Sequence, residues 1–230
     1  MDRFPSTSWE LLTHAARLGD SAATARNEFA ERYYGAIRAY IGALTRGTGP
    51  TDDLTQRFFE RVVLSGTLLA RADHEKGGFR QYLKQAIRYF LIGEHRQQSR
   101  LTANEVPLDG MADGWSLAAA DASPSPDEAM MRAWAQSLVA MALSALEHVC
   151  DEKRQREHFE MFVRRYVDDP DQPPSWSDVG APFGLDEKTA RNRTETAARQ
   201  FRSLVRQLVA SDIGASDDVD QELQTVLAVL

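Results

Sequence analysis

The stretch between residues 79 and 100 combines cations and aromatic rings at a spacing that suits contact with nucleic acid. One polar stripe with helical periodicity contains Gln81, Lys84, Gln85 and Arg88, and Tyr82 and Tyr89 border it. Cations follow phosphates and rings stack on unpaired bases, so this surface suits single-stranded or melting DNA. A solvated helix whose tyrosines close the edge of a core explains the pattern equally well. The candidate DNA contacts here are Arg80, Tyr82, Lys84, Gln85, Arg88 and Tyr89.

The segment 175–202 has the layout of a helix-turn-helix, in which a second helix reads DNA. Gly184 suits a left-handed turn, Leu185 fills the angle between the helices, and Asp186 can cap the second helix. Pro182 fits poorly inside the expected first helix, 177–183, because it lacks an amide donor. An ordinary helical hairpin with a solvated basic face is the alternative, and the pattern favours DNA. The candidate contacts are Lys188, Thr189, Arg191, Asn192, Arg193 and Arg199.

A third polar cluster opens the helix expected after Pro50. Asp52 and Asp53 lie in its first turn, where carboxylates complement the positive end of the helix dipole. That effect, with Thr51 as an N-cap, is one sufficient explanation. The other is that exposed acids at a helix start, together with Gln56 one turn later, meet an arginine-rich partner.

Several classes of chemistry have no basis in this sequence. His148, Cys150 and His158 lack a recognised zinc spacing. A glycine-rich phosphate loop and a nucleophile elbow are both missing from the sequence. We therefore expect no enzyme activity, metal, cofactor or small-molecule substrate.

Apolar residues at helical spacing indicate an all-α fold of two helical domains joined by a linker. One such face contains Ala22, Ala25, Phe29, Tyr33, Ile37, Tyr40 and Leu44. Further faces contain Leu54, Phe58 and Val62, and then Phe79, Leu83, Ala86, Phe90 and Leu91. The expected parts are a helical bundle at 1–100, a linker at 101–127, a helix-turn-helix domain at 128–212 and an amphipathic tail at 213–230.

The charge distribution and the cysteine content limit the partners and the compartment. The net charge is −7, while residues 71–100 carry an excess of +4 and residues 186–206 an excess of +3. Such local excesses in an acidic frame favour specific over indiscriminate binding of nucleic acid. Cys150 is the only cysteine, the start lacks a signal-peptide pattern, and no apolar run approaches a membrane span. We expect a cytoplasmic protein that does not enter a membrane.

Taken together, these motifs resemble the extracytoplasmic-function (ECF) sigma factors, the two-domain promoter-recognition subunits of bacterial RNA polymerase. Residues 52–59 look like the acidic start of the family's clamp-binding helix, and residues 79–89 like its promoter-melting helix. Residues 175–202 are similar to its reader of the upstream promoter element. The resemblance implies core RNA polymerase and promoter DNA as partners, with Asp52, Asp53 and Gln56 on the polymerase.

The sequence departs from the family where Pro50 and Thr51 stand in place of a further acid. Phosphorylation of Thr51 would add about −1.5 to −2 charge at a helix N-terminus. Some subgroups of the family are similarly poor in acid and are controlled by Ser/Thr kinases, so we expect a kinase as a third partner. The rival functions are a stand-alone helix-turn-helix regulator that binds operator DNA without polymerase, and an interaction module whose basic faces are only solvated.

Overall fold

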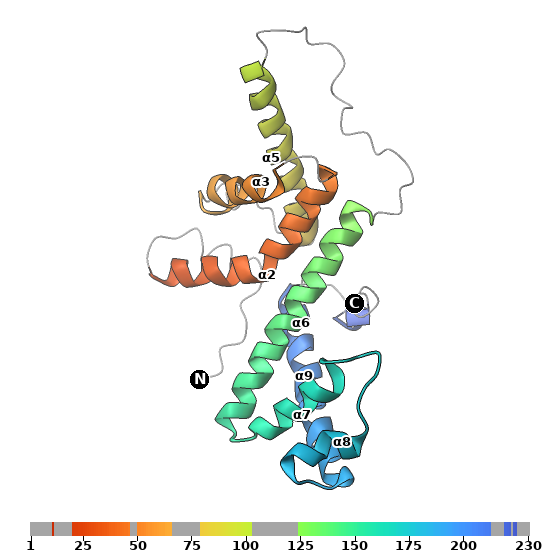
Figure 1. Ribbon diagram of the computed structural model, residues 1–230. Helices are drawn as coiled ribbons and strands as arrows, with labels where there is room; N and C mark the ends of the chain where they lie inside the picture. Colours follow the sequence, from red (N-terminus) through yellow and green to blue (C-terminus); the bar gives the residue numbers. More distant parts are fainter. Residues whose placement is uncertain are drawn as a thin grey trace. The chain divides into compact units, whose positions relative to one another are not determined.

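The computed structural model describes residues 11, 20–46, 50–65, 79–102, 124–212, 219–221 and 223–224 (Figure 1). The longer helices are α2 (Asp20–Leu44), α3 (Thr51–Phe58), α5 (Phe79–Thr102), α6 (Pro126–Glu152), α7 (Arg156–Tyr166) and α9 (Glu187–Asp212). The shorter ones are η1 (Phe59–Val63), α8 (Trp176–Gly180) and η2 (Ala181–Phe183). These described residues contain no strand, and the expected all-α class is confirmed. Most of the expected linker and tail lies outside them.

The chain divides into two compact units. Of the described residues, those between 6 and 137 and those after 210 form the N-terminal unit, and Leu138–Ala210 form the C-terminal unit. The division falls inside α6, whereas the sequence pattern predicts that the second domain starts at residue 128. The first turns of α6 therefore belong with α2, α3 and α5.

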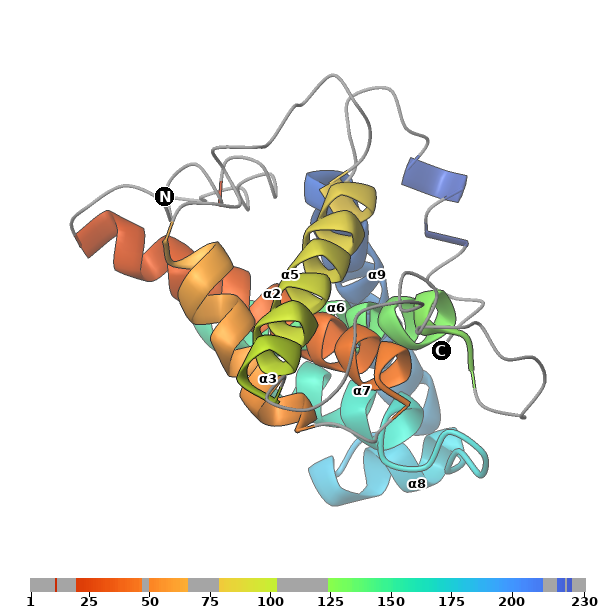
Figure 2. The same ribbon diagram turned by 90° about the horizontal axis from the view of Figure 1, so that it is seen from above.

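The N-terminal unit is built from α2, α3 and α5, which contact one another and lie together in Figures 1 and 2. Aromatic rings join the three helices. The ring of Tyr33 in α2 lies 5.1 Å from that of Phe79 in α5, edge to face. The ring of Phe58 in α3 lies 5.4 Å from that of Phe90 in α5. Such pairs stabilise the packing beyond the apolar area that they bury, so the start of α5 is held against α2 and its middle against α3.

The predicted apolar faces are largely confirmed. Every predicted residue of the α2 face is buried except Leu44, which is half-buried. In α5 the buried row is Phe79, Leu83, Ile87 and Leu91. Ile87 was missed, while Ala86 and Phe90 lie at the margin of this row and are only half-buried. The reason is that an i, i+4 row follows the contact with α2 and α3 more closely than the mixed spacing that was predicted.

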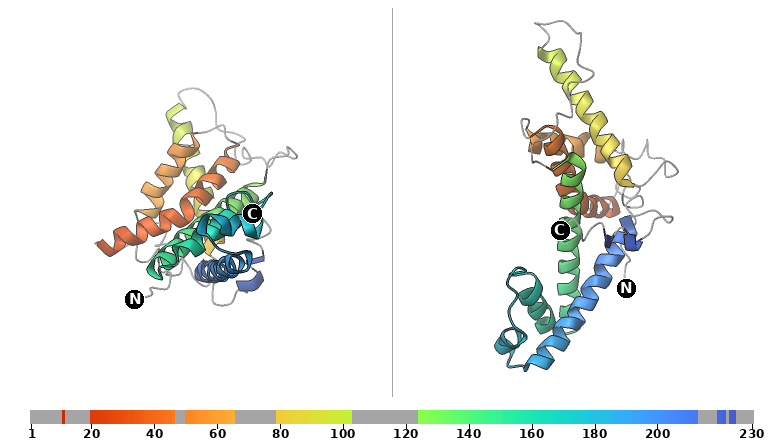
Figure 3. Two further views of the ribbon diagram at one scale, coloured as in Figure 1. Left: turned by 60° about the horizontal axis from the view of Figure 1, so that its bottom comes forward. Right: turned by 90° about the vertical axis from the view of Figure 1, so that its right-hand side faces the viewer.

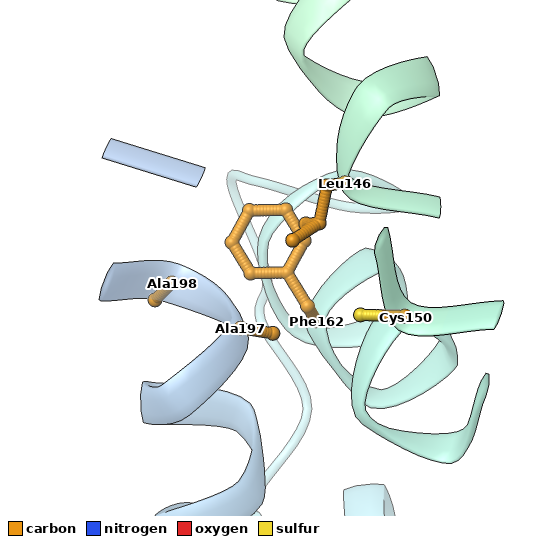
Figure 4. Packing of buried hydrophobic residues seen from close by; sticks show 5 residues of the cluster. All are labelled: Leu146, Cys150, Phe162, Ala197 and Ala198. Atoms are coloured by element: carbon orange, nitrogen blue, oxygen red, sulfur yellow. The ribbon is translucent and has the colours of Figure 1, made fainter. Parts of the chain in front are cut away.

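The C-terminal unit packs the second half of α6, α7 and α9 around a small core (Figure 4). Its buried residues are Leu146, Cys150, Phe162, Ala197 and Ala198. The two alanines let the backbone of α9 approach the ring of Phe162, because they present no more than a methyl group. A second cluster joins Met161 of α7, Val179 of α8 and Ala190 of α9. Figure 3 shows α7 and α8 beside the first turns of α9.

Helix α6 is the one described helix that is long and apolar enough to cross a membrane by length and composition. No uninterrupted apolar run in the sequence predicts such a helix. Core helices meet the same criterion, and Trp134, Leu138, Ala142 and Leu146 of α6 are buried inside the protein. A single helix of this kind is weak support for a membrane span, and the cytoplasmic location stays a prediction.

Candidate nucleic-acid and partner-docking surfaces

The turn between α8 and α9 has the local geometry that the sequence predicts. Gly184 adopts a left-handed conformation with φ 66°. The amide of Thr189 donates to Asp186 Oδ1 at 2.9 Å, and the Thr189 hydroxyl donates to Oδ2 at 2.9 Å. These hydrogen bonds, the backbone one first, hold the pKa of Asp186 below its usual value. Leu185 is half-buried against the cluster of Met161, Val179 and Ala190.

The first helix of this motif differs from the prediction. It was expected at 177–183, with Pro182 inside it, but α8 ends at Gly180 and Pro182 lies in the 3-10 turn η2. The missing proline amide therefore interrupts no α-helical hydrogen bond. Pro182 is thus compatible with a helix-turn-helix at this place. Ser175 caps α8, because its Oγ accepts from the amide of Asp178 at 3.2 Å and donates to Asp178 Oδ2 at 2.6 Å. The Ser-x-x-Asp spacing could have revealed this cap.

The six candidate contacts on α9 fall into two groups. Four of them lie in solvent, namely Lys188, Arg191, Asn192 and Arg199. Thr189 is half-buried because its hydroxyl completes the cap. Arg193 is half-buried and pairs with Glu157 of α7. The first group is available to a ligand, whereas Thr189 and Arg193 help to hold the motif together.

A tryptophan that is not among the predicted contacts lies beside this surface. The ring of Trp176, the first residue of α8, has the guanidinium of Arg165 4.8 Å from its centre and that of Arg191 5.9 Å away. Arg165 Nε and Nη1 are buried without a hydrogen-bond partner. The ring thus holds two cations near the start of the motif through cation–π attraction. The position of a tryptophan directly after a capping serine is the sequence feature that could have revealed this role.

Thr51 is the first residue of α3, and Pro50 occupies the N-cap position without a side-chain hydrogen bond. The alternative in which Thr51 is the N-cap is therefore wrong, because the helix begins one residue earlier than that role requires. A Cβ added to Gly42 would lie 3.4 Å from Thr51 Cγ2, so the threonine methyl packs over this glycine of α2. The Thr51 carbonyl accepts the hydroxyl of Thr55 at 2.7 Å.

The three candidate polymerase contacts on α3 all have partners within the chain. Asp52 Oδ1 accepts from Arg38 Nε of α2, and Asp53 pairs with Arg57 one turn later. The hydrogen bond from Arg38, followed by its charge, lowers the pKa of Asp52. Gln56 Nε2 donates to Glu60 Oε1 at 3.0 Å. Both carboxylates are exposed but locally neutralised.

Glu94 of α5 ties this region to the neighbouring helix. Its carboxylate accepts from Arg57 and, at 2.6 Å, from Arg61 Nη1 of η1. The Glu94 side chain is only 12% exposed, so this double pair is better shielded from water than the surface pairs nearby. The sequence pattern does not predict this role for Glu94, since both arginines lie more than thirty residues before it.

The candidate contacts on α5 also separate into two groups. Gln85, Arg88 and Tyr89 are exposed, Tyr89 by 68%, and Ile92 beside them is 42% exposed. Arg88 Nε donates to the hydroxyl of Tyr40 at 2.9 Å, and burial is the main reason that the pKa of Tyr40 is raised. Tyr82 is half-buried.

Arg80 and Lys84 are half-buried as well, and both contact the first half of α6. Lys84 Nζ lies 2.8 Å from Asp127 Oδ1, and the Arg80 guanidinium lies 4.2 Å from the ring centre of Trp134. Two of the predicted DNA contacts on α5 therefore meet side chains of α6.

The fold and these surfaces define an all-helical protein with a helix-turn-helix geometry. Within the described ranges no group of His, Cys, Asp and Glu could hold a metal ion. Comparisons with protein-family models, curated proteins and solved structures give no significant match.

Proposed function

We propose that this chain is an ECF-type sigma factor, a subunit that directs bacterial RNA polymerase to promoters. In this proposal α3 docks on the core enzyme, α5 engages melting promoter DNA, and the α8–α9 motif reads the upstream element. A Ser/Thr kinase activates the protein by modifying Thr51. These roles give the two helical units the functions of the family's two domains.

The observation that carries this proposal is the content of the N-terminal unit. One compact unit holds both the acid-started helix α3 and the face of α5 on which Arg88, Tyr89 and Ile92 are exposed. Exposed rings next to cations suit unpaired bases. A regulator that only binds duplex DNA through its helix-turn-helix has no need of either feature.

The pairing of Asp52 and Asp53 supports the switch at Thr51. Arg38 and Arg57 already neutralise these carboxylates, so the start of α3 offers little net negative charge to a basic partner. A phosphoryl group on Thr51 would add about −1.5 to −2 charge at the first turn of α3, where the helix dipole favours it. It would also compete with Asp52 for Arg38, since Thr51 packs on Gly42, one helical turn after Arg38 in α2.

The experiment compares unmodified protein with protein that carries phosphothreonine at position 51. Binding to fluorescent core polymerase at physiological salt should tighten at least about tenfold with the phosphoryl group, because charge-assisted hydrogen bonds form. Transcription from genomic fragments should follow the same order. Thr51→Val is the matched control, since it keeps the methyl that packs over Gly42. Arg38→Gln should strengthen binding of the unmodified protein by freeing Asp52.

Equal core binding with and without the phosphoryl group would refute the switch alone. Failure of both forms to bind core polymerase would refute the sigma-factor proposal. The second candidate is a stand-alone helix-turn-helix regulator, which the capped turn at Gly184 and Asp186 supports equally well. Specific duplex binding without any core polymerase would favour that candidate.

A further inference from the structure

The first half of α6 lies against the row of α5 cations that the proposed function assigns to DNA. Lys84 Nζ is 2.8 Å from Asp127 Oδ1, and Arg80 Nη1 is 3.2 Å from Met131 Sδ. The Arg80 guanidinium also stacks on Trp134, 4.2 Å from the ring centre. All these residues belong to the N-terminal unit.

Buried side chains of α6 anchor this contact. Trp134 is 1% exposed, and Met130 and Ala135 are buried beside it in α6. The side chain of Lys84 keeps 20% of its exposure, while that of Asp127 keeps 58%. The three apolar side chains are removed from water, which stabilises the position of the first half of α6. The ion pair lies at the open edge of the contact and contributes less.

The ammonium of Lys84 is the group at this edge that can bind an anion. A lysine ammonium binds a carboxylate and a phosphate in the same way, as a point charge with rotatable donors. Asp127 also lies close enough to Tyr40 for its charge to raise the pKa of that phenol, whose oxygen accepts from Arg88. Asp127 thus pairs with one of these cations, Lys84, and its charge also acts on the phenol that Arg88 contacts.

Asp127 has no part in the cap that starts α6. That cap is formed by Ser125 and Glu128, since Glu128 Oε2 accepts the Ser125 amide at 2.7 Å and Ser125 Oγ accepts the Glu128 amide at 3.2 Å. The carboxylate of Asp127 can therefore be neutralised while the helix start remains intact.

We propose that Asp127 is an internal substitute for a DNA phosphate, and that the first half of α6 must leave Arg80 and Lys84 before α5 takes a DNA strand. This inference rests on the proposed function, because it assumes that these two cations bind DNA. Asp127 then competes with the DNA backbone for Lys84, and this competition lowers the affinity of the free protein for single-stranded DNA. Engagement of DNA and release of the α6 segment are then linked.

The test uses the full chain with Asp127→Asn. Glu31→Gln is the matched control, because it also removes one exposed negative charge from the N-terminal unit. The first readout is the rate at which an amine-reactive reagent labels Lys84, measured by mass spectrometry against the exposed Lys188. In the wild type, Lys84 should label more slowly than Lys188. In Asp127→Asn, Lys84 should label faster than it does in the wild type, whereas Glu31→Gln should leave its rate unchanged.

The second readout is the affinity for a fluorescent single-stranded oligodeoxynucleotide. Asp127→Asn should bind about two- to fivefold more tightly than the control, the range set by one exposed ion pair. Equal labelling of Lys84 and Lys188 in the wild type, or equal DNA affinity of the two variants, would overturn the inference. If no variant binds DNA while Lys84 remains protected from labelling, that result would refute the proposed DNA-binding function. It would also refute the competition between Asp127 and DNA.

Discussion

Gly180 is the position where one added methyl group should open the helix-turn-helix. A Cβ built on Gly180 lies 2.7 Å from the carbonyl oxygen of Leu185 and 2.9 Å from the Cβ of Ala190. Non-bonded carbon contacts are usually about 3.5–4.0 Å long, so α8 and α9 must separate by more than about half an ångström. Neither neighbour is the flexible end of a side chain, and the backbone itself has to move.

The expected cost of Gly180→Ala follows from what this movement disturbs. Forcing a methyl into a packed site costs about 1–3 kcal/mol. The separation also weakens the bond from the Leu185 amide to the Gly180 carbonyl, 3.2 Å long, which contributes about 0.5–1.5 kcal/mol. Alanine recovers about 0.5–1 kcal/mol, since Gly180 has helical dihedral angles. The net loss should be about 2 kcal/mol.

Native-state amide hydrogen exchange measures this loss where it occurs. The Leu185 amide should exchange roughly thirtyfold faster in Gly180→Ala, because each 1.4 kcal/mol is a factor of ten in the opening equilibrium. Gly184→Ala is the matched comparison in the same turn. It meets no atom within 4 Å but keeps φ 66°, so it should cost about 1–2 kcal/mol through strain alone. A Gly180→Ala protein within about 0.5 kcal/mol of the wild type would refute the steric argument.

Three further outcomes are expected. Gly93→Ala should raise the free energy of unfolding, measured in urea, by about 0.5–1 kcal/mol. A Cβ added at this position meets no atom within 4 Å, and alanine is favoured over glycine inside a helix such as α5. A lower free energy of unfolding would contradict the open space at Gly93. Asp186→Ala should lower the thermal midpoint at pH 7. The difference between this variant and the wild type should vanish as the pH falls from 3.8 through the lowered pKa of Asp186, because the carboxylate becomes protonated. A difference that does not depend on pH would disprove the carboxylate cap. Cys150, whose thiol pKa burial raises, should resist iodoacetamide at neutral pH until urea is added, and rapid native alkylation would contradict its burial.

The sequence by itself determined the features that depend on neighbouring residues. The apolar face of α2, the left-handed Gly184 and the cap at Asp186 were all predicted and are confirmed. Each rests on periodicity or on a contact three residues away, so the local chemistry is sufficient. The position of Thr51 was less secure, because a helix that starts after proline can take either residue as its cap.

Only the tertiary structure decided which polar residues remain available to a partner. Arg193 pairs with Glu157, 36 residues away, and Arg57 with Glu94, 37 residues away. Arg38 pairs with Asp52 across 14 residues, and Lys84 meets Asp127 of another helix. A charged residue at an outward helical position looks the same in sequence whether or not a distant helix supplies its counter-ion. The packing of the helices selects that counter-ion, and it thereby sets how much charge each surface presents.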